Sequence, residues 1–401
     1  RVNEEELCDC RKFFHSQLAG RVEGLSMREA ILEANYWNAE NVMYQATDGR
    51  TISAMGAYRS AYGRCGEESA FGVNVFRALG IPARQIYTPR WAHCDDNHAW
   101  VEVWCDGKWY FLGACEPEEV LNKGWFTNAS SRAMLIHSRC FSDISGEEVI
   151  SKVGMANFLN NLKLYAVTTR LTVTVKDAAG APVEGAQVSF GILNYSDIFP
   201  AAVVTTGADG IAALTCGLGT INIHVKKDSL HCERMVYTPD CDQVEIVLQT
   251  ETPVWDTWED FVSVAPRDQI VNGAKPTEEQ KELGLKKTAA ANAKREQRVA
   301  EMFSEARARA VVEPAGYSQD FYDLLFERCG NVELLIGFLE DGAFTAREKE
   351  ALLLTLSKKD RRDVDPDILR EALALTRGYA AGRDDLFYPY IVCPRVFNEP
   401  L

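Results

Sequence analysis

One short stretch, Gly63-Arg64-Cys65-Gly66-Glu67-Glu68-Ser69, most constrains how this chain can fold, because it places a cysteine where a helix begins. After it, Phe71, Val75 and Leu79 are spaced at i, i+4 and i+8, which predicts the apolar face of a helix ending near Gly80. Unpaired backbone N–H groups at a helix N-terminus favour an anion, so the sequence predicts a lowered pKa for the Cys65 thiol. We interpret Cys65 as a nucleophile, because the thiolate is the reactive form.

The segment 97–104 is predicted to supply a base, because its apolar and polar residues alternate as in a β-strand. Asp106-Gly107 follows and favours a type I′ turn, which pairs residue 105 with residue 108. Continued outward along strands that run to Lys108 and about Cys115, this register places Cys115 opposite His98 and Gly113 diagonal to His98 on the same face. His98 is therefore the predicted general base.

Three blocks of the sequence carry a family resemblance. They are Gly63-Arg64-Cys65-Gly66-Glu67, then Asn97-His98-Ala99-Trp100-Val101-Glu102-Val103, then Trp109 through Ala114-Cys115-Glu116. In this order and spacing they resemble the core of transglutaminase-like proteins, with an echo of the peptide:N-glycanase branch, over roughly residues 30 to 140. The resemblance implies a papain-like cysteine site. Cys65 would attack an amide carbonyl, His98 would exchange the proton, and water or an amine would resolve the thioester.

The position of the orienting acid departs from the family pattern. Where the family usually carries an aspartate shortly after the strand's tryptophan, this chain has Gly113, which offers no side chain. Glu116 is the candidate for the third catalytic role, with Asp95 or Asp96 as alternatives. A second interpretation is that Glu116 only begins a turn at Pro117.

Substrate-binding residues are predicted on both sides of the catalytic blocks. Trp37 and Asn38 lie upstream of the nucleophile, where a papain-like site has an oxyanion donor; the alternative for Trp37 is a place in the core. The loop 90–97 runs directly into His98, so we expect it to line the cleft, with Trp91, Asp96 and Asn97 as its candidate residues. His93 in this loop is a competing base that lacks the strand context.

Changes in residue pattern and composition along the sequence predict three domains. Residues 1–165 form an α+β transglutaminase-like core, and residues 166–250 alternate in the manner of an all-β sandwich that resembles prealbumin-like or carboxypeptidase-regulatory-like modules. Residues 251–401 comprise a linker, anchored by Trp255 and Trp258, and a helical C-terminal region in which we predict no site chemistry.

Composition limits the partners. The net charge of −15 disfavours nucleic acid, and no run is long enough to cross a membrane. Cys8-Asp9-Cys10 has no histidine cluster near it, so we expect no metal and no cofactor. The scattered cysteines fit a reduced, cytoplasmic setting, with secretion as the alternative if the N-terminus is a processing boundary. The sequence does not indicate an oligomeric state.

Two classes of function follow. The first is a cysteine enzyme that acts on amide bonds of a peptide, protein or glycopeptide, by peptide or isopeptide hydrolysis, deglycosylation of asparagine, or acyl transfer to an amine. The second is a binding or scaffold protein that keeps a transglutaminase-like core without catalysis, for which the missing aspartate argues. Intact Cys65 and His98 favour the enzyme.

Overall fold

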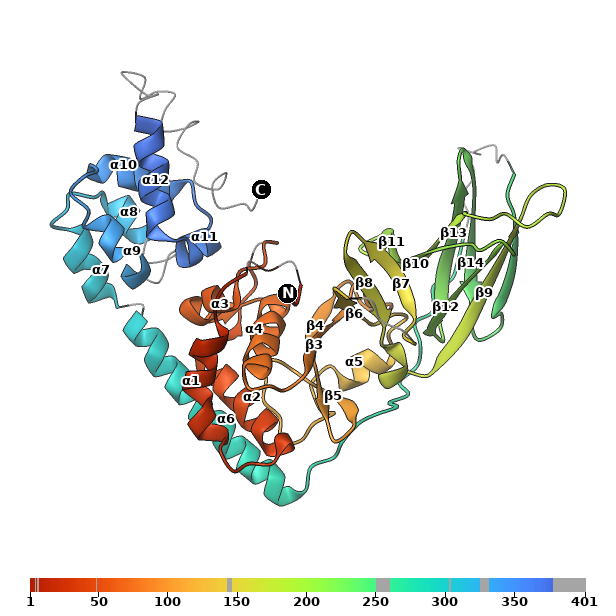
Figure 1. Ribbon diagram of the computed structural model, residues 1–401, viewed down its shortest axis with the longest axis horizontal. Coiled ribbons are helices and arrows are strands. Elements are labelled where there is room, and N and C mark those ends of the chain that lie inside the picture. The colour runs from red at the N-terminus through yellow and green to blue at the C-terminus, as the bar shows by residue number, and fades with distance from the viewer. Residues whose placement is uncertain are drawn as a thin grey trace.

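The computed structural model describes residues 1–377, apart from residues 4, 6, 48, 143–145, 250–259, 303 and 325–331. The described elements form an α+β N-terminal part, a β-sandwich and a helical C-terminal part, so the predicted fold class is confirmed (Figure 1). The division into domains at residues 165 and 250 stays a prediction. Trp255 and Trp258, the predicted linker anchors, lie outside the described residues.

The N-terminal part is built on a six-stranded antiparallel sheet in the order β5-β4-β3-β6-β8-β7. Its strands are β3 (Ala83–Thr88), β4 (His98–Cys105), β5 (Lys108–Leu112), β6 (His137–Cys140), β7 (Val149–Val153) and β8 (Ala156–Asn160). The turn between β4 and β5 has positive φ at both Asp106 (51°) and Gly107 (81°), as a type I′ turn requires. The predicted register is confirmed from the Cys105–Lys108 pair to the Val101–Leu112 pair.

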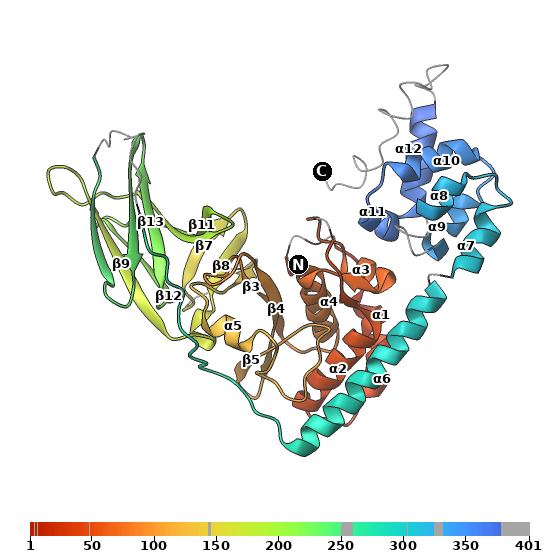
Figure 2. The same ribbon diagram turned by 180° about the vertical axis from the view of Figure 1, so that it is seen from behind.

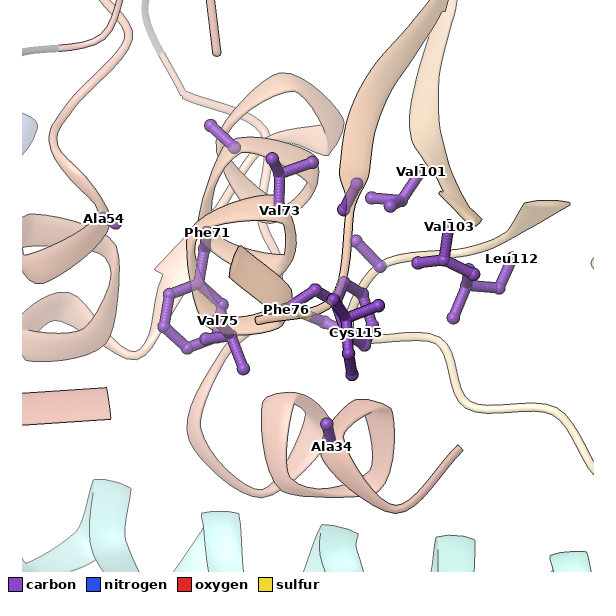
Figure 3. Packing of buried hydrophobic residues seen from close by; sticks show 14 of the residues in the cluster. Ala34, Ala54, Phe71, Val73, Val75, Phe76, Val101, Val103, Leu112 and Cys115 are labelled. Carbon is purple, nitrogen blue, oxygen red and sulfur yellow. The ribbon is translucent and has the colours of Figure 1, made fainter. Parts of the chain in front are cut away.

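Helices cover one face of this sheet. They are α2 (Met27–Asn41) and α4 (Cys65–Ala78), which contact the sheet, and α1 (Arg11–Val22) and α3 (Ala54–Ser60), which pack on α4; a short β1 (Met43–Tyr44) pairs with β2 (Tyr62–Gly63), and α5 (Thr127–Ser131) follows β5 in the chain. Helix α4 packs on β4 and β3, and Figure 3 shows its apolar side chains beside those of β4. Gly72 favours this close approach, because a Cβ there would lie 3.2 Å from Ala114 Cβ, which is tighter than usual.

The β-sandwich consists of two sheets that share one apolar core. One sheet has the order β11-β10-β13-β14 and the other β12-β9-β15. Their strands are β9 (Thr168–Lys176), β10 (Gln187–Asn194), β11 (Asp197–Thr205), β12 (Ile211–Gly217), β13 (Thr220–Lys227), β14 (Leu230–Tyr237) and β15 (Gln243–Val247). Met134, Leu135 and Ile150 of the N-terminal part join this core, so the two parts are packed together. The likeness to prealbumin-like modules stays a prediction.

The C-terminal part begins with the long helix α6, which runs along α2 (Figure 2). Ion pairs join Lys287 to Glu33 at 2.7 Å and Lys294 to Glu40 at 3.1 Å. The described helices are α6 (Glu278–Met302), α7 (Glu305–Val312), α8 (Gln319–Leu324), α9 (Val332–Leu339), α10 (Ala346–Leu354), α11 (Lys358–Asp363) and α12 (Pro366–Arg377). Helices α7 to α10 and α12 share a core of their own, and the charged helix α11 contacts α3 of the N-terminal part.

Candidate active site

Cys65 is the first residue of α4, as the sequence predicts. The backbone N–H groups of Ala99 on β4 and of Gly66 lie near its sulfur and favour the charged form of the thiol. The preceding residue is held as well, because Arg64 N–H donates to Glu67 Oε2 at 3.0 Å. The thiol therefore has a fixed place between the start of a helix and the start of a strand.

The predicted lowering of the Cys65 pKa is wrong. Burial raises the pKa of this thiol above its ordinary value, and the nearby Glu68 carboxyl acts in the same direction. The N–H of Ala99, the Arg64 charge and the N–H of Gly66 oppose that rise without cancelling it. The resting cysteine at neutral pH is consequently a thiol, and its reaction needs a base.

His98 begins β4, one residue before the N–H that lies near the thiol. Its ring lies 4.6 Å from that of Trp125, 5.2 Å from Phe126 and 5.7 Å from Trp100, centroid to centroid. Burial in this aromatic setting lowers the pKa of His98 to about 4, so the imidazole is neutral and able to accept a proton. Within the described residues, no hydrogen bond joins it to Cys65, and its Nε2 has no partner.

The chain after β5 does not continue the strand as far as predicted. Regular pairing ends at Leu112, Gly113 forms a bridge with Glu116, and Cys115 has a left-handed φ of 59°. The expectation that Cys115 lies opposite His98 is therefore wrong, and Cys115 is buried in the core instead. Asn35 on α2 holds this turn: its Nδ2 donates to Gly113 O at 2.8 Å and its Oδ1 accepts from Cys115 N–H at 3.2 Å.

Glu116 folds back over Gly113. Its Oε2 lies 2.6 Å from the place that a Cβ on Gly113 would occupy, so the carboxylate fills the space of the missing side chain. The hydrogen bonds that it accepts come from Trp125 Nε1, at 3.1 Å to Oε1 and 3.0 Å to Oε2. Trp125 thus stands between Glu116 and His98. Burial raises the pKa of Glu116 to about 7.

Glu68 is a second buried carboxyl that the sequence interpretation missed. It lies one turn after Cys65, and its Oε1 has no hydrogen-bond partner among the described residues. Burial raises its pKa well above the usual range, and the charges of Glu116 and Glu67 add to the rise. The sequence did contain a signal for it: Glu68 lies three residues after Cys65, and residues at this spacing share one face of a helix.

A cleft of about 150 Å³ opens beside the thiol. Of the predicted binding residues, Asn97 lines it. Trp91 lies instead in the aromatic core, stacked on Trp100, and Asp96 is exposed, with its side chain accepting from Asn97 N–H at 2.7 Å. The other described lining residues are Asn3, Gly49, Thr51, Arg64, Cys65, Gly66, Gln85, Tyr87, Ala99, His137, Ser138 and Arg139.

The two predicted oxyanion candidates lie in the helical core. Trp37 stacks on Tyr58 and Phe71, so the alternative interpretation of a core tryptophan describes its surroundings. Asn38 is fully buried, and its Nδ2 lies 3.4 Å from Asn35 Oδ1. The structure thus brings Cys65, His98, Glu116 and Asn97 to one end of the sheet. Trp37 and Asn38 lie elsewhere, buried among the helices that pack around α2.

The loop before His98 is fastened to the β-sandwich. Asn194 Nδ2 donates to Trp91 O at 2.9 Å and to Cys94 O at 2.8 Å. Asp95 Oδ1 accepts from Tyr195 N–H at 2.6 Å, so this alternative acid is engaged in holding the loop. The ring of the competing base His93 lies 5.3 Å from that of Trp91, centroid to centroid, and His93, like His98 and Glu116, is not among the described residues that line the cleft.

His137 lines the cleft and was also missed. It begins β6, and burial lowers its pKa to about 3. His137 reaches the cleft through the pairing of β6 with β3, and the sequence of neither strand predicts that pairing.

Among the described residues, no group of His, Cys, Asp and Glu has the arrangement of a metal site. None of the described helices is both long and apolar enough to span a bilayer.

Comparison with known proteins matches one segment of the N-terminal part. Residues 16–114 match the model of the transglutaminase-like superfamily, which confirms the predicted transglutaminase-like resemblance over this segment, and the likeness to the peptide:N-glycanase branch stays a prediction. A crystal structure described as a "putative cysteine protease" from Cytophaga hutchinsonii is 25% identical, with a TM-score of 0.23; the match covers 28% of this chain and 40% of that protein. A streptococcal ancillary pilin is 8% identical, with a TM-score of 0.18, over 42% of this chain and 61% of the pilin. No curated protein matches the sequence.

Proposed function

We propose that the transglutaminase-like core of residues 16–114 belongs to an enzyme that cleaves or transfers amide bonds through a thioester on Cys65. The observation that carries this proposal is the placement of Cys65 in a cleft at the start of α4, with the N–H groups of Ala99 and Gly66 near its sulfur. Backbone N–H groups beside a nucleophile are the kind of donor that stabilises the oxyanion formed when a thiolate adds to a carbonyl, provided that they point at that oxygen.

The proposed reaction has two halves. His98 takes the thiol proton as Cys65 Sγ forms a bond to the amide carbon; the C–N bond then breaks, and the imidazolium gives its proton to the leaving amine. Water, deprotonated by the same imidazole, adds to the thioester, the C–S bond breaks, and the sulfur regains a proton. If an amine replaces water, the product is a new amide. The neutral state of His98 at rest supports this role.

Glu116 is the proposed orienting acid. Its carboxylate lies where an aspartate at position 113 would begin, and the buried Nε2 of His98 has no other partner within the described residues. In the resting structure the carboxylate accepts from Trp125 instead. A rotation of Trp125, whose side chain is largely exposed, would let Glu116 receive the second ring N–H as the imidazolium forms.

The test is a substrate panel with Cys65→Ala as the paired variant. Peptides, isopeptide-linked peptides and asparagine-linked glycopeptides are offered with and without a primary amine, and products are identified by mass spectrometry. We expect one class to turn over with wild-type protein and none with Cys65→Ala at unchanged fold. The scaffold alternative predicts no turnover and a Cys65 that iodoacetamide alkylates no faster than the exposed Cys241.

A further inference from the structure

One wall of the cleft is formed by the segment 45–52, of which residue 48 is not described. Gly49 and Thr51 line the cleft together with Cys65. Arg64, directly before the cysteine, fastens this wall: its Nη2 donates to Gly49 O at 2.6 Å and to Thr51 Oγ1 at 2.8 Å. The position of the wall is therefore tied to the start of the cysteine helix.

The buried Glu67 carboxylate also links the cleft wall to the start of α4. It accepts from Arg64 N–H at 3.0 Å in the first turn of α4, and from Ile52 N–H and Thr47 Oγ1 at 3.2 Å each in the wall. Its side chain is fully buried. A buried carboxylate needs a compensating charge as well as hydrogen bonds, because removing it from water is costly.

That charge comes from the C-terminal part of the chain. Lys359 on α11 lies 2.9 Å from Glu67 Oε1, with the two side chains 3% and 0% exposed. Lys359 Nζ also donates to the carbonyl of Arg50 in the wall. The next residue, Asp360, pairs with Arg50 at 2.8 Å. Helix α11 thus contacts both the wall and the carboxylate beneath it.

We infer that Lys359 is a positioning residue of the Cys65 site, which acts through Glu67 to hold the cleft wall and the first turn of α4 in place. The inference rests on the proposed function, and it makes the helical C-terminal part a component of the site rather than an appended module. Without the ammonium group, the Glu67 carboxylate loses its countercharge, and we expect water to reach it and the wall to open. An opened wall exposes the thiol and relieves the burial that disfavours its charged form.

The experiment measures the alkylation of Cys65 by iodoacetamide in the full chain, by mass spectrometry, as a function of pH. In Lys359→Met we expect Cys65 to react about five- to tenfold faster at pH 7, with its pH profile displaced downward by nearly one unit, since one unit is a tenfold change in thiolate. Hydrogen exchange of the amides in residues 49–52 should accelerate by at least tenfold. Lys359→Arg, which keeps the charge, should restore both.

Lys349→Met is the matched control. Lys349 is a buried lysine of the same helical part, and its Nζ donates to Leu339 O at 2.6 Å and Asp341 O at 2.9 Å within that part. It should leave the Cys65 profile unchanged. If Lys359→Met does not accumulate as folded protein, Glu67→Gln breaks the same pair from the other side: it leaves the buried Lys359 ammonium without its countercharge, so water should enter there and displace the profile in the same direction.

An unaltered Cys65 profile and unaltered exchange at residues 49–52 in these variants would overturn the inference. So would an equal effect of Lys349→Met, because it would reduce Lys359 to general stability of the helical part. The proposed function fails separately: wild-type protein would then turn over no member of the substrate panel, whatever Lys359→Met does to alkylation.

Discussion

Trp125→Phe should raise the pKa of the Glu116 carboxyl, because Trp125 is its hydrogen-bond donor. The indole Nε1 lies 3.1 Å and 3.0 Å from the two carboxylate oxygens. Burial raises this pKa to about 7, and the indole N–H opposes the rise by stabilising the charged form. Phenylalanine keeps a ring beside His98 and removes only the donor.

The magnitude follows from the strength and exposure of that bond. A hydrogen bond to a charged group contributes about 1.5–3 kcal/mol, and one pKa unit corresponds to about 1.4 kcal/mol. Trp125 is 63% exposed, so water replaces part of the lost bond and the lower end applies. Loss of a donor to the charged form favours the neutral form, so we expect the pKa of Glu116 to rise by about one unit, to about 8.

The assay is again the pH dependence of Cys65 alkylation, between pH 5 and 9. An ionised Glu116 stabilises the imidazolium that forms as the thiol loses its proton, so the rate should rise as Glu116 ionises. The midpoint of this step should lie near 7 in wild type and about one unit higher in Trp125→Phe. The step should vanish in Glu116→Gln, whereas Trp104→Phe, which changes an exposed tryptophan of β4, should leave it in place. Coinciding midpoints in wild type and Trp125→Phe would refute the reasoning.

Three further predictions concern the same end of the sheet. His98→Ala should lower turnover on the order of 10²- to 10⁴-fold, the usual share of a general base, and a loss below about threefold would transfer the role to His137 or His93. Glu116→Ala should lower turnover strongly, and Gly113→Asp in that background should restore part of it; no recovery in a folded double variant would exclude position 113 as a place for the acid. Asn35→Ala should destabilise the protein by on the order of 3 kcal/mol in chemical denaturation, because Gly113 O and Cys115 N–H lose their buried partner, and an unchanged midpoint would contradict this.

The turn of the β4-β5 hairpin and the register next to it could be predicted from the sequence, because both depend on neighbouring residues. Asp106-Gly107 fixes a type I′ turn, and the turn fixes the register through Val101–Leu112. Its end could not be predicted by extending that register. Asn35 lies on α2, and its amide competes for the backbone of Gly113 and Cys115, so a contact distant in sequence stops the strand at Leu112.

The pKa of the Cys65 thiol also depends on contacts that are distant in sequence. A helix N-terminus favours the thiolate, and the contributions of Gly66 and Arg64 in the structure have that sign. Burial has the opposite sign and outweighs them, and burial is a result of tertiary packing that the local sequence does not show. The contact of Lys359 with Glu67 is of the same kind, because no local pattern in the sequence shows that these two residues meet.

The turn at residues 113–116 explains why position 113 is a glycine and not an acid. A side chain at position 113 and the Glu116 carboxylate cannot coexist as they stand, because a Cβ on Gly113 would lie 2.6 Å from Glu116 Oε2 and 3.0 Å from Glu116 Cβ. Gly113 is therefore the residue that lets an acid from three positions later reach the same place. For the same reason the recovery test needs alanine at position 116, since glutamine would fill the space that an aspartate side chain introduced by Gly113→Asp requires. With Glu116 in its proposed role, the departure from the family pattern is a transfer of the acid from one side of the turn to the other.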